Sequence, residues 1–179
     1  MGPIVADANR RFELSKALLD RAKRTADNDL QRSLAEMAIT SAFSCLEGML
    51  THVFEHFVES TAFDIFEQSV MQEKSIRFVC GRPSLTDQRF HSIEDRLQFL
   101  FWRFSGQEFD KNKTWWPHFS SAVGFRNEIM HPKAPSATTV DDAERSLSAI
   151  VSAIDDLMMV VFRKRWPKAK RGLTSSLSI

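Results

Sequence analysis

The sequence has 179 residues, of which 43% are hydrophobic and 26% charged, as expected for one globular domain and not for a disordered chain. Its formal net charge of +1 indicates no particular class of partner. Cys45 and Cys80 lie in otherwise apolar segments, which is typical of a reducing compartment and predicts a cytoplasmic protein. The first residues carry charges where a signal peptide is apolar. The longest uncharged run, 37–46, is shorter than the roughly 20 residues that span a bilayer, so we expect no membrane contact.

Apolar residues recur at spacings of three and four along most of the chain, a pattern that predicts an all-α fold. In chain order we expect helices over about 5–26, 28–59, 63–74, 92–104, 115–131 and 140–163. The second helix is apolar around most of its circumference, so it should lie in the middle of the bundle. Turn-like polar segments at 80–91 and 105–114 are expected to be surface loops.

Residues that commonly cap helices support these boundaries. Asn28 or Asp29 can begin the second helix, and Ser92 followed by Asp95 resembles a helix start. Thr139, with an acidic residue three positions later, is expected to cap the last helix. The chain should therefore form one antiparallel helical bundle over 1–165, with a long central helix and a long C-terminal helix.

The segment 166–179 is expected to be a basic, flexible tail. Its cations continue a run that begins at the end of the last helix and consists of Arg163, Lys164, Arg165, Lys168, Lys170 and Arg171. Such a run can contact nucleic-acid phosphates. It can also be a solvated helix end followed by disorder, because cations are favoured near a helix C-terminus. We favour the second interpretation, since a charge run alone is weak support for a nucleic-acid site.

The stretch GFRNEIMHPKAP, residues 124–135, places polar side chains on a helix that stops at a proline. A projection at about 100° per residue groups the apolar side chains of this helix on one face. They are Phe119, Ala122, Val123, Phe125, Ile129 and Met130. Arg126 falls in the middle of this face, where an arginine needs an anionic or hydrogen-bonding partner. That partner is either an internal carboxylate, from Glu47, Glu94 or Asp95, or the phosphate of a ligand.

Asn127 and His131 lie one helical turn apart at the edge of the same face. Because Pro132 disfavours the α conformation at the preceding residue, His131 should end the helix with its ring free to leave the helix surface. A histidine can change charge near neutral pH, so beside a fixed cation and an amide it is a candidate acid–base group for phosphate ester chemistry. Alternatively, His131 serves only as a helix cap.

The segment RNEIMH, with Arg126, Asn127 and His131, resembles the Arg-(four to six residues)-His signature of HEPN domains, in which asparagine often follows the arginine. The helix order is also similar, because in that family the motif ends a late helix and precedes a loop and a long last helix. The pattern SAFSCLEGML on the expected central helix is similar to one in many larger members, with Glu47 matching their acid. The resemblance extends over roughly residues 10–163.

The resemblance implies a metal-independent endoribonuclease without a cofactor, commonly of toxin or phage-defence systems, that acts as a homodimer with both motifs lining one cleft. His131 would act as acid or base while the ribose 2′-OH attacks the adjacent phosphorus. Arg126 would bind the phosphate, and Asn127 would position the phosphate or the histidine. The expected products are a 2′,3′-cyclic phosphate and a 5′-OH end. RNA and an inhibitor or antitoxin protein are the expected partners.

Two points limit what the resemblance implies. One HEPN subgroup, paired with nucleotidyltransferase antitoxins, carries a tyrosine two positions after the histidine. This chain has Lys133 there and no tyrosine at any position, so regulation through that tyrosine is not expected. Some HEPN domains are not nucleases. The alternative is therefore a non-catalytic dimeric module that binds a protein or a nucleotide, with Arg126 held by an internal carboxylate and His131 as a cap.

A competing metal site is suggested by HVFEH, residues 52–56, which matches the H-x-x-E-H pattern of inverted zinc peptidases. His52 and His56 lie one turn apart, and Glu55 could act as a base. No third ligand can be placed, however, and Glu55 continues an ordinary polar stripe along the helix. We therefore expect no metal at this position.

The same polar stripe includes Glu47, so this residue either supports the site or is simply solvated or at a dimer interface. The segment TWWPHF supplies Trp115, Trp116 and His118, which could stack on RNA bases. Adjacent tryptophans at a helix start are more often core and interface anchors, which is the interpretation that we favour.

Overall fold

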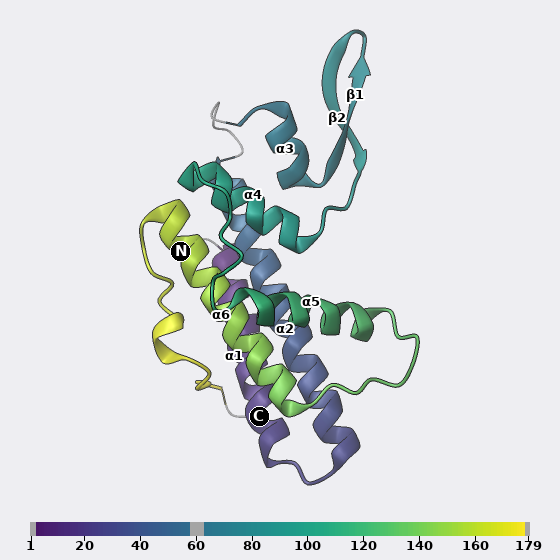
Figure 1. Ribbon diagram of the computed structural model, residues 1–179, viewed down its shortest axis with the longest axis vertical. Helices are drawn as coiled ribbons and strands as arrows, with labels where there is room; N and C mark the ends of the chain where they lie inside the picture. The colour runs from purple at the N-terminus through teal and green to yellow at the C-terminus, as the bar shows by residue number, and fades with distance from the viewer. Residues whose placement is uncertain (1–2, 58–62, 178–179) are drawn as a thin grey trace.

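The computed structural model describes residues 3–57 and 63–177, and it is mainly helical, with 67% helix and a two-stranded sheet (Figure 1). Its elements are α1 (Pro3–Arg24), α2 (Asn28–Phe57), α3 (Ile65–Gln72), β1 (Lys74–Val79), β2 (Arg82–Gln88), α4 (Ile93–Ser105), α5 (Trp116–Met130), α6 (Val140–Phe162) and the short 3₁₀ helix η1 (Ala169–Arg171). The prediction of a helical fold is thus confirmed in its coarse form. The expected end of the second helix, at residue 59, lies outside the described residues.

Helix α2 is the centre of the fold, as its apolar circumference predicts. It packs against α1, α5 and α6, and Figure 1 shows α1, α2 and α6 side by side with α5 lying across them. Ten of its side chains are buried: Ala35, Ala38, Ile39, Ala42, Phe43, Cys45, Leu46, Met49, Leu50 and Val53. Small residues let the neighbouring helices approach closely. A Cβ added at Gly48 would lie only 3.2 Å from the Ala8 Cβ of α1.

Helix α2 is also the one helix within the described residues that is long and apolar enough to cross a membrane, by length and composition alone. The core helix of a water-soluble bundle passes the same test, and half of the apolar window of α2 is buried inside the fold. This property therefore does not decide where the protein resides. The cytoplasmic location and the lack of membrane contact stay predictions.

Side-chain caps define several helix starts. Thr139 and Asp142 form a capping box at α6, and the Ser92 hydroxyl accepts a hydrogen bond from the Asp95 backbone at α4, as the sequence predicts. At α2, by contrast, the cap is Asp27, whose carboxylate accepts hydrogen bonds from the backbone of Asp29 and Leu30. The predicted cap at Asn28 or Asp29 is therefore wrong by one or two residues.

The predicted all-α fold overlooks a β-hairpin. Residues 63–74 were expected to be helical and 80–91 to be a loop, but α3 ends at Gln72, and β1 pairs with β2 as an antiparallel ribbon. The two loop residues, Cys80 and Gly81, both have positive φ, as in the tight hairpin turns whose twist matches that of the strands. Neither strand has a buried face, so the apolar alternation that normally reveals a strand is weak. Figure 1 shows the hairpin projecting beyond α3 and α4.

The C-terminal segment also differs from the prediction of a flexible tail after residue 165. Trp166 is 1% exposed, contacts the ring of Phe12 on α1, and donates a hydrogen bond from its indole nitrogen to Asn9. The carboxylate of Asp155 on α6 accepts a hydrogen bond from the Trp166 backbone and pairs with Arg165. Burial of one large aromatic side chain thus holds the chain on α1 beyond the expected domain boundary.

Glu13 on α1 joins this segment to the bundle. Its carboxylate pairs with Lys16 at 3.0 Å and with Lys168 at 2.9 Å, and it accepts hydrogen bonds from the backbone and hydroxyl of Ser176. Lys16 is fully buried and also donates to the Thr174 carbonyl. Burial alone would raise the pKa of Glu13, but the hydrogen bonds from Ser176, Lys168 and Lys16 lower it to about 2. The charged carboxylate therefore stabilises the folded state.

We expect Glu13→Gln to lower the free energy of unfolding at neutral pH by about 3 kcal/mol, because the substitution leaves the buried Lys16 ammonium without its anion. Since the folded-state pKa of Glu13 is depressed, this stabilisation is complete above about pH 4.5 and is lost as the pH falls toward about 2. Denaturant unfolding at several pH values measures the effect, with the exposed Glu108→Gln as the matched control. A parent–variant difference that does not shrink on acidification would contradict the assignment.

Candidate functional site

The residues of the predicted motif lie at the C-terminal end of α5. This helix is anchored by Phe119 and Ala122, which are fully buried, and the ring of Phe119 packs on that of Phe43 from α2. With one side of α5 fixed in this way, the last turn of the helix brings Arg126 over the surface of α2. The predicted apolar face is therefore real at the start of α5, but it becomes half-exposed toward the motif.

Arg126 pairs with Glu47 of α2. Its Nη2 lies 2.9 Å from the Glu47 Oε1, and its Nη1 donates a longer hydrogen bond of 3.4 Å to the side-chain oxygen of Asn127. Of the three carboxylates that the sequence offers, the structure thus selects Glu47. Glu94 instead accepts a hydrogen bond from the Ser120 hydroxyl. The side chains of Arg126 and Glu47 are 34% and 42% exposed, so the pair lies at the rim of the core and not inside it.

His131 ends α5, as expected for a residue before proline. Its φ of −133° and ψ of 64° are not helical, and its backbone N–H donates to the Asn127 carbonyl at 2.9 Å. The residue is exposed. Among the described residues, no hydrogen bond joins its ring to Arg126, Asn127 or Glu47. The ring is therefore available to a ligand, whereas Arg126 is already oriented.

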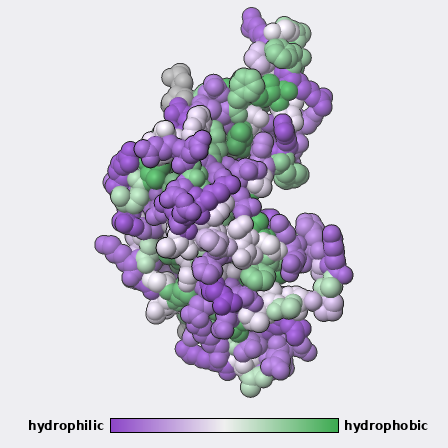
Figure 2. All heavy atoms as spheres, in the orientation of Figure 1, coloured by the Kyte–Doolittle hydropathy of each residue, from purple (hydrophilic) through white to green (hydrophobic). Residues whose placement is uncertain are grey.

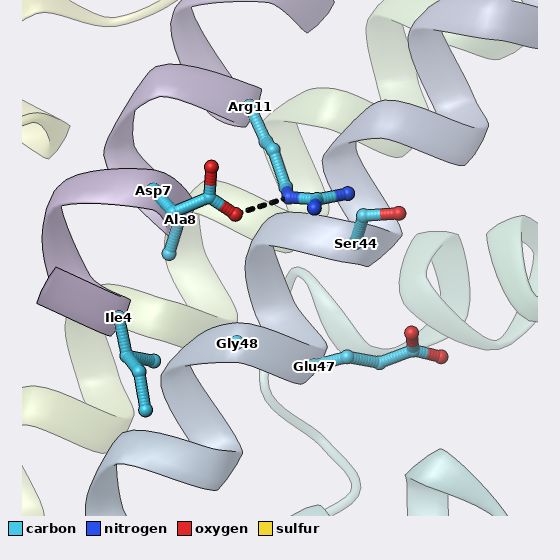
Figure 3. Close-up of a pocket in the computed structure, with 7 residues that line it drawn as sticks. All are labelled: Ile4, Asp7, Ala8, Arg11, Ser44, Glu47 and Gly48. Atoms are coloured by element: carbon cyan, nitrogen blue, oxygen red, sulfur yellow. Dashed lines mark hydrogen bonds and ion pairs between the residues drawn. The ribbon is translucent and has the colours of Figure 1, made fainter.

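An open groove of about 480 Å³ lies beside Glu47, between α1 and α2 (Figure 3). It is lined by Asp7 and Arg11 of α1 and by Ser44 and Glu47 of α2. The Arg11 Nε lies 2.7 Å from the Asp7 carboxylate, and Figure 3 shows Glu47 extending away from this pair. The hydrogen bond that Arg11 donates to Asp7 first, and then the charge of Asp7, raise the pKa of Arg11, with a smaller contribution from Glu47. Glu47 thus has one arginine in contact and a second nearby.

The sequence does not reveal Arg11 as a neighbour of the motif. Arg11 and Asp7 form an i,i+4 pair on an amphipathic helix, a pattern that normally indicates only a solvated helix face. The approach of α1 to α2, which brings Arg11 toward Glu47, depends on packing between residues far apart in sequence. No local signal predicts it.

The candidate zinc site is not assembled. The rings of His52 and His56 both pack on Phe162 of α6, at centroid distances of 5.9 and 5.3 Å. Burial first, and then the neighbouring His56, lower the pKa of His52. Within the described residues no three metal-ligating side chains lie together so that they could hold a metal ion. His52, Glu55 and His56 therefore do not form such a group.

The two tryptophans at the start of α5 are anchors, as we expected from their position. Trp115 is 8% exposed and donates a hydrogen bond from its indole nitrogen to Asp156 of α6 at 3.0 Å. Trp116 is half-buried and stacks on Phe119. Neither ring is free to stack on a base without disrupting the attachment of α5 to the bundle. His118, by contrast, is exposed on α5.

Comparisons with protein-family models, with characterised proteins and with solved structures gave no match. The fold and the site therefore define a mainly helical protein with an arginine–glutamate pair and an exposed histidine at the end of α5. The resemblance to HEPN domains stays a prediction that depends on the motif and on the order of the helices.

The exposure of the Glu47–Arg126 pair predicts that it contributes little to stability. In a double-mutant cycle with Glu47→Gln and Arg126→Gln, we expect a coupling free energy below about 1 kcal/mol, as for other partly solvated ion pairs. Denaturant unfolding of the parent, both single variants and the double variant provides the measurement. A coupling of about 3 to 5 kcal/mol, typical of the loss of one partner from a buried pair, would mean that Arg126 is committed to Glu47.

Proposed function

We propose that this protein is a metal-independent endoribonuclease of the HEPN type that acts as a homodimer on RNA. The observation that carries the proposal is the combination at the end of α5: an oriented arginine with unused donors, an adjacent amide and an exposed histidine one turn further on. These groups match the three positions of the motif. No cofactor is required, because the 2′-hydroxyl of the substrate is itself the nucleophile.

Arg126 retains the capacity to bind a phosphate. A guanidinium carries five N–H donors, and Glu47 and Asn127 each accept only one hydrogen bond from it. The remaining donors can engage two phosphate oxygens in fork geometry. Glu47 thus holds Arg126 in place without consuming it, which reduces the conformational entropy lost when the phosphate binds.

The proposed reaction is an internal phosphoryl transfer. The ribose 2′-oxygen attacks the adjacent phosphorus as its proton passes to one His131 imidazole, and the bond from phosphorus to the 5′-oxygen breaks. The departing 5′-oxygen takes a proton from an imidazolium, which in a homodimer is supplied by the second copy of His131. Arg126 stabilises the negative charge that builds on the non-bridging oxygens, and Asn127 orients the phosphate. The products are a 2′,3′-cyclic phosphate and a 5′-OH end.

The biological setting follows from the resemblance alone. We propose a toxin or phage-defence role in the cytoplasm, with an inhibitor protein that restrains the nuclease. The second candidate function is a non-catalytic module that binds a protein or a nucleotide. The Glu47–Arg126 ion pair favours this function, because it already gives the arginine an anionic partner. The two functions differ in whether RNA is cleaved.

We expect the purified parent protein to cleave RNA in excess chelator, and His131→Ala and Arg126→Ala each to reduce the rate at least about 100-fold. His118→Ala is the matched control, because it removes an exposed histidine from the same helix. Product analysis should show cyclic phosphate ends. Absence of cleavage by a dimeric parent protein would favour the binding module. Activity that chelator abolishes would contradict the metal-independent mechanism.

The variant Glu47→Gln tests what the ion pair with Arg126 contributes to RNA binding and to cleavage. Removal of the carboxylate charge should strengthen RNA binding several-fold, because the phosphate is no longer repelled by a second anion beside Arg126. It should lower the maximal cleavage rate, because Arg126 loses the group that orients it. Single-turnover kinetics over a range of protein concentrations separates the two effects. Weaker binding together with an unchanged maximal rate would contradict this role of Glu47.

A further inference from the structure

The β1–β2 hairpin exposes aromatic side chains that no packing of the described structure explains. Phe78 is 77% exposed and Phe90, just after β2, is 79% exposed, while Val79 beside the turn is 51% exposed. Large apolar side chains on a projecting ribbon gain nothing from the hydrophobic effect unless something covers them. The hairpin therefore presents a contact surface.

The same ribbon is strongly basic. Residues 74–90 carry four cations, Lys74, Arg77, Arg82 and Arg89, against the single carboxylate of Asp87. Asp87 pairs with Arg77 at 2.6 Å, whereas Lys74, Arg82 and Arg89 are exposed and make no ion pair within the described part of the chain. Since the whole chain has a net charge of only +1, the residues outside the hairpin are net negative. Positive charge is thus enriched on this element, as it also is on the run from Arg163 to Arg171.

Exposed aromatic rings interleaved with unpaired cations are the combination that binds single-stranded nucleic acid. The bases stack on the rings, and the phosphates lie against the cations. In the register of the ribbon, Phe78 is opposite Pro83, whereas Arg82 is opposite Val79. Neighbouring pairs point to opposite faces, so near the tip the ring of Phe78 lies on one face of the ribbon and Arg82 lies on the other. Figure 2 shows hydrophobic and hydrophilic side chains intermixed there.

The hairpin also lies on the side of the molecule that carries the motif. In Figure 1 the hairpin extends from the upper end of the molecule and the C-terminal end of α5 projects to the right below it, and in Figure 2 the outline of the molecule is hollowed between them. A strand held at the hairpin could therefore continue toward the end of α5 without crossing the bundle.

We propose that the β1–β2 hairpin, residues 74–90, is a docking arm for single-stranded nucleic acid that holds the strand away from the cleavage motif. The choice of RNA over DNA rests on the proposed ribonuclease function. The arm contributes affinity and has no catalytic role, because Phe78, Phe90 and the three unpaired cations lie on a separate element from His131.

The test is fluorescence anisotropy with the full chain, in chelator and with His131→Ala as the background to prevent cleavage. The probes are end-labelled oligouridylate and oligothymidylate of about 20 nucleotides, which exceeds the site of a typical single-strand-binding domain. The triple variant Lys74→Gln, Arg82→Gln and Arg89→Gln should bind at least tenfold more weakly. The slope of log affinity against log salt should fall by about 2, because three phosphate contacts are lost.

The aromatic part is tested separately. Phe78→Ser with Phe90→Ser should weaken RNA binding at least about fivefold while leaving the salt slope unchanged, since stacking is not electrostatic. The matched controls are Phe66→Ser, an exposed phenylalanine on α3, and the triple variant Arg21→Gln, Arg24→Gln and Lys111→Gln, which removes the same charge elsewhere. Both controls should bind like the background protein.

The results of these binding experiments test the docking arm separately from the proposed ribonuclease activity. Hairpin variants that bind as tightly as the background, or controls that weaken binding equally, would overturn the docking arm even if the parent protein cleaves RNA. Hairpin-dependent binding by a protein that cleaves nothing would support the arm and overturn the nuclease. Binding of oligothymidylate but not oligouridylate would overturn the assignment to RNA. Binding to anionic lipid vesicles with no binding to either oligonucleotide would overturn the arm altogether.

Discussion

The packing of α2 against three other helices is the constraint on which the rest of the structure depends. A helix with buried side chains on several sides can only exist inside a shell, so α1, α5 and α6 must surround it. The polar residues of α2 are then confined to the narrow strip that these neighbours leave open. Glu47 lies on this strip, between the end of α5 and the open groove that Asp7 and Arg11 line. The burial that stabilises the fold thus also selects the carboxylate that meets Arg126.

Two ion pairs of this protein differ in the same way, one lying in the core and the other at its solvent-exposed rim. The fully buried ion pair, Glu13 with Lys16, is surrounded by further hydrogen bonds and holds the C-terminal segment on α1. Within the described residues the Glu47–Arg126 pair has one additional partner, Asn127, and it is open to solvent. A buried and fully hydrogen-bonded network is costly to disrupt, whereas an exposed pair can accept a further anion at little cost. The two pairs are therefore suited to different tasks, the first to fixing the fold and the second to binding.

The sequence predicts those parts of the structure that local patterns determine. Periodicity identifies the helices, Thr139 and Ser92 identify two helix starts, and Pro132 identifies the end of α5. Of the candidate site, the sequence narrows the partner of Arg126 to three carboxylates but cannot choose among them, because the choice depends on how α5 crosses α2. The hairpin escapes detection because neither strand has a buried face to impose alternation. The docking of Trp166 on α1 joins residues about 150 positions apart, and no local pattern signals it.

The exposed aromatic residues of the hairpin and the half-exposed Arg126 have the same physical explanation. In each case a side chain that is expensive to leave incompletely partnered is kept at the surface, Phe78 on the projecting hairpin and Arg126 at the exposed end of α5. Deletion of the ring of Phe78 or of the charge of Arg82 removes nothing that holds the bundle together, since both are outside it. The proposed nucleic-acid ligand, with both bases and phosphates, would give each of these groups a partner and would connect the hairpin to the arginine at the end of α5.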